Sequence, residues 1–127
     1  MKSRLILVSS CLFVSVILCV LSSRFVNASM NGLLNDTSSV LAYAKAGQTE
    51  KAVDALTNML SSLKKQTPIL ETFLPHESIH EIYAHLADAS TSLEIGDTED
   101  FEKALSLLTE SAKHLISHEK ASVSNIL

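Results

Sequence analysis

A short segment in the second half of the chain carries the residue types of a zinc enzyme. His76, Glu77 and His80 match the pattern H-E-x-x-H. On a helix, two histidines four residues apart lie on one face and can bind zinc, while the glutamate serves as a general base. Enzymes that use this motif place the helix beside a sheet whose edge strand binds substrate, and this sequence has no strand pattern. We therefore expect no enzyme, and an H-E-x-x-H metallohydrolase is the alternative.

A second pair of histidines, His114 and His118, has the same spacing. If two helices form an antiparallel hairpin about Gly96, His80 lies level with Lys113, and both histidine pairs lie at one height. Four imidazoles could then bind zinc, nickel or copper. Histidines at the edge of an apolar helix face more often cover apolar surface with their rings and bind no metal. We therefore expect no cofactor and keep zinc as the alternative. The candidate metal ligands are His76, His80, His114 and His118.

Other kinds of chemistry have no support in the sequence. Cys11 and Cys19 both lie in the apolar N-terminal segment, so the rest of the chain has no thiol for a disulfide, a zinc–thiolate cluster or a nucleophile. Three of the ten basic residues precede Ser29, which leaves seven lysines against fourteen acids. This acidic balance, without tryptophan, argues against nucleic-acid binding and against electrostatic docking to anionic lipid.

The N-terminus has the layout of an export segment. Lys2 and Arg4 precede an apolar run over residues 5–21 that is interrupted only by serines. Such a run predicts a signal peptide or a membrane anchor. Because basic residues stay on the cytoplasmic side, the rest of the chain is expected to face outward. The first expected partner is therefore the membrane, bound through this segment.

The sequence leaves open whether this segment is cleaved. Val26-Asn27-Ala28 is an acceptable small-residue cleavage site, with Ser29 as the first mature residue. The nearly membrane-spanning length of the run favours an uncleaved anchor. We predict a signal peptide or uncleaved anchor over residues 1–28 and an extracytoplasmic helical domain over residues 29–127. The protein would be single-pass in the cell membrane with this domain outside, or secreted.

The periodicity of apolar residues predicts an all-α fold: an N-terminal signal or anchor helix followed by a small antiparallel bundle of about four helices. The turn Gly47-Gln48-Thr49-Glu50 is repeated as Gly96-Asp97-Thr98-Glu99, which favours two similar helical hairpins. The aromatic residues expected in the core are Tyr43, Phe73, Tyr83 and Phe101. The predicted helices cover residues 32–46, residues 49–65, the segment from Pro68 to Gly96 with a break or kink at Pro75, and a segment that begins at Asp97 or Thr98.

The chain resembles an uncharacterised family of short exported proteins from spore-forming Firmicutes, domain-of-unknown-function family 4363. The shared features are an N-terminal anchor, Pro75-His76 followed by Ile79 and Ile82, a short turn, and an ending of Glu119 with Asn125-Ile126-Leu127. The resemblance implies a helical fold and a membrane location, and it implies no activity. It also implies a contact between His76 and Glu119 that joins the third helix to the C-terminal helix.

These observations favour a non-enzymatic module with a binding or structural role. Its second partner would be a protein, unidentified from the sequence, that docks on a helix face or groove. The alternative function is a histidine-based metal-binding protein or metallohydrolase.

Overall fold

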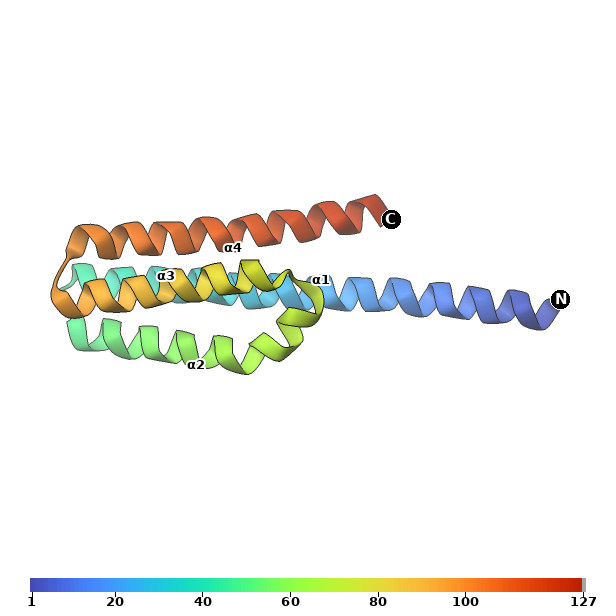
Figure 1. The fold of residues 1–127 in the computed structure, drawn as a ribbon, viewed down its shortest axis with the longest axis horizontal. Helices are drawn as coiled ribbons and strands as arrows, with labels where there is room; N and C mark the ends of the chain where they lie inside the picture. Colours follow the sequence, from blue (N-terminus) through green and yellow to red (C-terminus); the bar gives the residue numbers. More distant parts are fainter. Residues whose placement is uncertain (127) are drawn as a thin grey trace.

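The computed structural model describes residues 1–126, apart from the side chains at 122, 123 and 126, and it consists of four helices (Figure 1). The helices are α1 (Lys2–Lys45), α2 (Thr49–Phe73), α3 (His76–Ile95) and α4 (Thr98–Ile126). α1 and α3 each pack against both α2 and α4, so the helices form a closed ring of neighbours. This is an antiparallel four-helix bundle of up-down-up-down topology, and the described residues contain no strand. The predicted all-α fold is confirmed.

The apolar N-terminal segment and the first helix of the bundle are one continuous helix. α1 is 44 residues long, and its N-terminal half projects from the bundle (Figure 1). The predicted helix start at Gly32 is wrong, because Gly32 lies inside α1. A glycine costs a helix only about 1 kcal/mol, and the packing of the flanking turns offsets that cost. The buried residues of α1 recur three or four positions apart, which keeps one stripe against the bundle; they are Ser23, Val26, Met30, Leu33, Thr37 and Val40.

The projecting half of α1 does not pack against the bundle. By length and composition it is suited to crossing a membrane, a property that signal sequences share. None of its most apolar window of 18 residues is buried. The structure thus agrees with the predicted signal or anchor helix at this coarse level.

The two predicted hairpin turns have the same geometry. Gly47 and Gly96 adopt φ values of +76° and +77°, in the left-handed region where a residue without Cβ is favoured. In both turns a backbone N–H of the residue after glycine reaches back five positions to a carbonyl. These bonds run from Gln48 to Tyr43 and from Asp97 to Ser92, both at 2.9 Å. Asp97 also caps α4, since its Oδ1 accepts the backbone N–H of Asp100 at 3.1 Å.

The boundary between α2 and α3 differs from the prediction. α2 continues through Pro68 to Phe73, so the expected helix start at Thr67-Pro68 is wrong. Figure 1 shows the last turns of α2 bending toward α3, as expected where proline removes a backbone donor. The chain breaks instead at Leu74, which is extended (φ −114°, ψ 150°) as residues before proline prefer. Pro75 then precedes α3, which agrees with the predicted break at that position.

The core is one column of apolar side chains from all four helices. Phe101 is only 2% exposed, and Tyr43 and Tyr83 pack against the core as half-buried side chains. Phe73 was predicted in the core but is 41% exposed. It is the last residue of α2, beyond the bend at Pro68, where few side chains surround it. The largest fully buried side chains are Phe101, Met30, Leu70, Ile82, Leu108, Val26 and Val40.

Candidate functional site

The H-E-x-x-H motif occupies the first turns of α3. Pro75 is the N-cap with φ −58° and ψ 138°, so the motif begins directly at a helix start. His76 and Glu77 are exposed there. A carboxylate in a first helical turn interacts favourably with the positive end of the helix dipole. No described residue forms a strand beside this helix, so the arrangement found in enzymes with this motif does not arise within residues 1–126.

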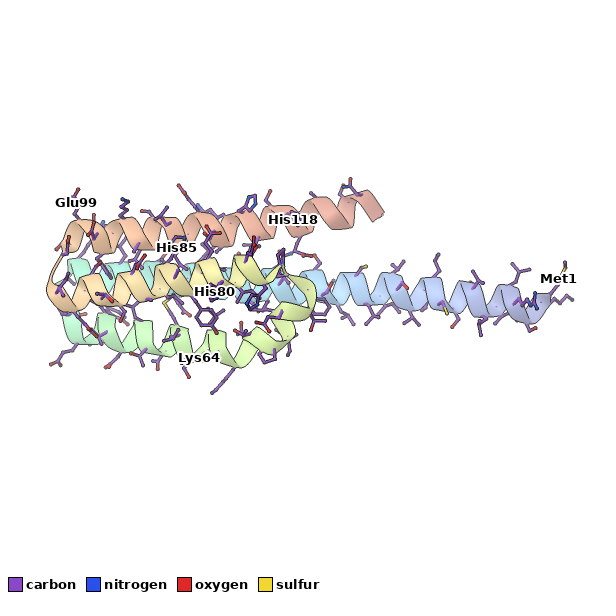
Figure 2. All side chains as sticks on the ribbon, viewed as in Figure 1. Met1, Lys64, His80, His85, Glu99 and His118 are labelled. Carbon is purple, nitrogen blue, oxygen red and sulfur yellow. The ribbon has the colours of Figure 1, made fainter. Side chains whose placement is uncertain are left out.

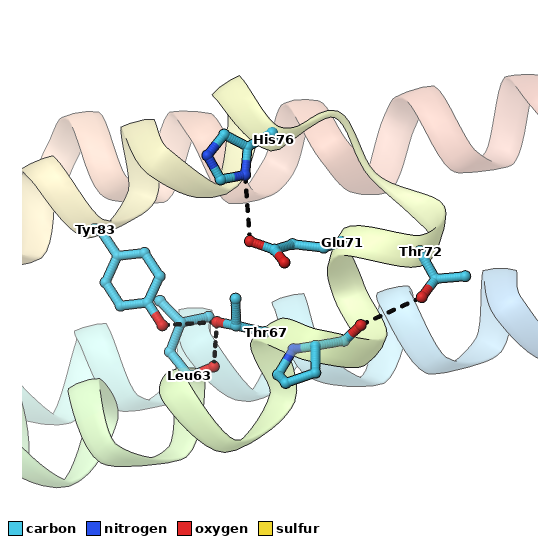
Figure 3. Close-up of polar contacts among 7 residues, drawn as sticks. Leu63, Thr67, Glu71, Thr72, His76 and Tyr83 are labelled. Atoms are coloured by element: carbon cyan, nitrogen blue, oxygen red, sulfur yellow. Dashed lines mark hydrogen bonds and ion pairs between the residues drawn. The ribbon is translucent and has the colours of Figure 1, made fainter.

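The two histidines of the motif do lie together. The rings of His76 and His80 stack with their centroids 5.7 Å apart and their planes 28° apart. His76 Nδ1 lies 3.2 Å from Glu71 Oε1, which belongs to the last turns of α2 (Figure 3). The three side chains therefore form a polar cluster at the α2–α3 junction. A protonated His76 would make this contact an ion pair, but both partners are solvent-exposed, so its contribution to stability is small.

The second pair of histidines lies on α4, and one of the two, His114, lies beside α3. His114 lines a groove of about 360 Å³ between α3 and α4, together with Ser78 and Glu81. Ser111 donates a hydrogen bond to Glu81 Oε1 at 3.2 Å. This pairing differs by one residue from the predicted register of His80 with Lys113. The predicted hairpin is thus confirmed, and the two histidine pairs lie at similar heights.

The structure nevertheless does not bring the four imidazoles together. His76 and His80 share the side of α3 that faces α2, whereas Ser78 and Glu81 share the side that faces α4. Figure 2 shows His80 on α3 and His118 on the separate helix α4. Among the side chains that the structure describes, no group of three or more His, Cys, Asp or Glu could hold a metal ion.

The predicted pair of His76 and Glu119 is also not formed. The ion-pair partner of His76 is Glu71, from the helix that precedes it in the chain. Within residues 1–121, where every side chain is described, no salt bridge links His76 to Glu119. α3 is therefore tied at its start to α2.

One polar contact between helices and one within α3 were not predicted from the sequence. Thr67 Oγ1 donates to the Leu63 carbonyl at 2.7 Å, so its oxygen accepts the hydroxyl proton of Tyr83, 2.6 Å away (Figure 3). On the other side of α3, His85 Nε2 lies 3.6 Å from Glu81 Oε1. The helical spacing of Tyr83 suggested only a core role, although a half-buried tyrosine needs a partner for its hydroxyl. The contact between Thr67 and Tyr83 fastens α3 to α2, whereas Glu81 and His85 both belong to α3.

These positions lead to a testable expectation for zinc. Because no three potential ligands among the described side chains are placed to hold a metal ion together, zinc should leave the melting temperature of the purified protein unchanged. A ligand that binds only the folded state would raise the melting temperature, because it stabilises the folded protein by about 2.7 kcal/mol at one hundred times its Kd. Thermal melts with and without zinc measure this. A zinc-dependent rise that disappears in both His76→Ala and His114→Ala, but not in the control His85→Ala, would show that the two pairs meet around a metal.

Comparison with known proteins places the chain in a family without assigning a chemistry to this cluster. No curated protein and no solved structure matches the sequence significantly. The family described as "Domain of unknown function (DUF4363)" matches residues 20–126. The match begins within the apolar segment and covers the whole bundle, including both histidine pairs. The chain therefore belongs to the DUF4363 family.

Proposed function

We propose that the protein is a non-enzymatic binding or structural module, held outside a membrane by the N-terminal half of α1. The observation that carries this proposal is the division of α1 into two halves. The apolar side chains of residues 5–22 lie outside the core, whereas burial in the bundle begins at Ser23. Residues 5–22 span about 27 Å as a helix, close to the thickness of a hydrocarbon core of about 30 Å. Lipid would cover the apolar surface that the bundle leaves exposed.

The packing of α1 supports an anchor that stays attached. Val26 is 0% exposed and belongs to the core, although it precedes the predicted cleavage position after Ala28. Cleavage there would remove Val26 and Ser23 from the bundle. Burying a side chain of this size contributes about 1.5–3 kcal/mol, so the uncleaved chain is the better-packed form. The predicted boundary between residues 28 and 29 falls in the middle of a packed helix.

The end of the bundle farthest from the anchor supports the proposed docking of a protein partner. A cavity of about 330 Å³ opens there beside the Gly96 turn, and its lining combines apolar side chains with three acids and one base, Lys45. Ile95 is 72% exposed at its edge. A partner segment that carries both apolar and basic side chains would match this surface. Its main lining residues are Leu41, Leu93, Ile95, Phe101, Glu94 and Glu102.

Labelling of single cysteines tests the topology. In a background of Cys11→Ala and Cys19→Ala, which removes both native thiols, one cysteine is introduced at Ser3 or at Glu99. With Lys2 and Arg4 inside, a membrane-impermeant maleimide added to intact cells should label Glu99→Cys. It should label Ser3→Cys only after permeabilisation. Both variants should remain full-length in the membrane fraction.

Two results would contradict the proposal. Labelling of Ser3→Cys in intact cells would reverse the orientation. Recovery of labelled Glu99→Cys from the medium, with an N-terminus at Ser29, would show that the anchor is removed.

A further inference from the structure

The described part of the bundle exposes few large apolar side chains, and two of them lie together. Ile69 is 49% exposed and Phe73 is 41% exposed. They are four residues apart on the last turns of α2, so they share one helix face. We call them the basal patch. These residues belong neither to the polar cluster of His76, His80 and Glu71 nor to the cavity beside the Gly96 turn.

The basal patch lies at the height where α1 leaves the bundle. One groove between α1 and α2 is lined by Ala28 and Asp36 of α1 and by Met59 and Gln66 of α2. Because the two helices are antiparallel, Ala28 lies level with Gln66, and Asp36 lies level with Met59. The same register places Phe73 level with residues 21–22, at the end of the apolar segment. Figure 1 shows the α2–α3 turn at the point where α1 emerges.

We propose that the basal patch inserts into the boundary between headgroups and acyl chains, so that the bundle contacts the bilayer beside α1. The inference rests on the proposed function, in which α1 spans the membrane. α1 has no turn between its apolar half and its packed half, so the base of the bundle is held against the lipid surface. Lipid is therefore the partner next to these side chains, and Figure 1 shows that α4 extends past the α2–α3 turn toward the same surface.

The charges near the patch suit this arrangement. Lys65 lies four residues before Ile69, on the same face, and it is exposed. Its ammonium group would lie farther from the membrane than the patch, at the level of lipid phosphates. Glu71, the nearest acid on α2, lies on another face and contacts His76 instead. No acidic side chain of α2 thus lies on the face that would enter the lipid.

Tryptophan fluorescence tests the inference, because the chain has no tryptophan of its own. The full-length variants Phe73→Trp and Ile69→Trp each report on the patch. Ile95→Trp is the matched control, an exposed apolar position at the opposite end of the bundle. Leu12→Trp reports on the apolar half of α1. Each variant is reconstituted into phosphatidylcholine vesicles without bromine, with bromine on the upper acyl chain, or with bromine near the end of the acyl chain.

We expect brominated lipid to quench Phe73→Trp, Ile69→Trp and Leu12→Trp, and to leave Ile95→Trp unquenched. Quenching of Leu12→Trp without quenching at either patch position would overturn the inference and leave the anchor intact. If Leu12→Trp is also unquenched, the anchor itself is wrong. A blue-shifted but unquenched emission at both patch positions would mean that protein, such as a second copy, covers the patch, and this too would overturn the inference.

Discussion

Replacing Phe101 with alanine should be among the most damaging single changes in the bundle. The ring is 2% exposed and packs in the core beside the Gly96 turn. Truncation of a buried phenylalanine costs about 3–5 kcal/mol, because it loses the transfer energy of the ring and leaves a cavity. For a domain near 100 residues, each kcal/mol shifts the melting temperature by roughly 4–8 °C. Thermal melts followed by circular dichroism in detergent should therefore show a drop of more than about 12 °C.

Phe73→Ala is the matched control for this measurement. It removes the same atoms from a side chain that is 41% exposed at the end of α2. Less apolar surface returns to water and no closed cavity forms, so the loss should be about 1 kcal/mol or less. Equal losses in the two variants would mean that Phe101 is not buried in the folded protein.

Val26→Asp should destabilise the protein by a similar amount. An aspartate at this position would place an unpaired carboxylate in the core, and an uncompensated buried charge typically costs about 3–5 kcal/mol of stability. The effect depends on residue 26 remaining in the mature chain. The same thermal melt on the purified mature protein measures it.

The control for Val26→Asp is Asn31→Asp, which adds the same charge at an exposed position of α1. Its melting temperature should stay close to that of the unaltered protein. Because Val26 belongs to the predicted cleavage site, an aspartate there would itself block cleavage, so the N-terminus is determined on the unaltered protein. An N-terminus at Ser29 in the unaltered protein would refute both the anchor and the role of Val26 in the core.

Helix ends were predictable where local chemistry decides them. Gly47 and Gly96 end helices because they adopt positive φ, and Pro75 separates α2 from α3 because proline restricts the residue before it. Pro68 misled the prediction because tertiary contacts prevail there. Thr67 bonds back to the preceding turn and accepts the hydroxyl of Tyr83 from α3, which holds the bent helix together. No sequence pattern predicts the contact between Thr67 and Tyr83.

The candidate site was predicted in part for a related reason. Helical spacing correctly predicted that His76 and His80 are neighbours, and the hairpin register was correct to one residue. The side of α3 that faces α4 depends on the rotation of the helix about its own axis. That rotation is set by packing against two neighbours at once, as the contact between Glu81 and Ser111 shows. A helical wheel drawn from one segment carries no information about it.

The continuity of α1 has a mechanical consequence. A membrane helix changes its tilt when bilayer thickness or curvature changes, and tilts of about 20° are ordinary. Because the two halves of α1 form one continuous helix, the bundle would tilt together with the membrane-spanning segment as a rigid body. If α1 spans the bilayer as proposed, residues 23–45 would extend about 35 Å beyond it, and a tilt of 20° would carry the distal turns sideways by about 12 Å. A partner bound at those turns would sense the deformation of the lipid as a displacement of its own binding surface.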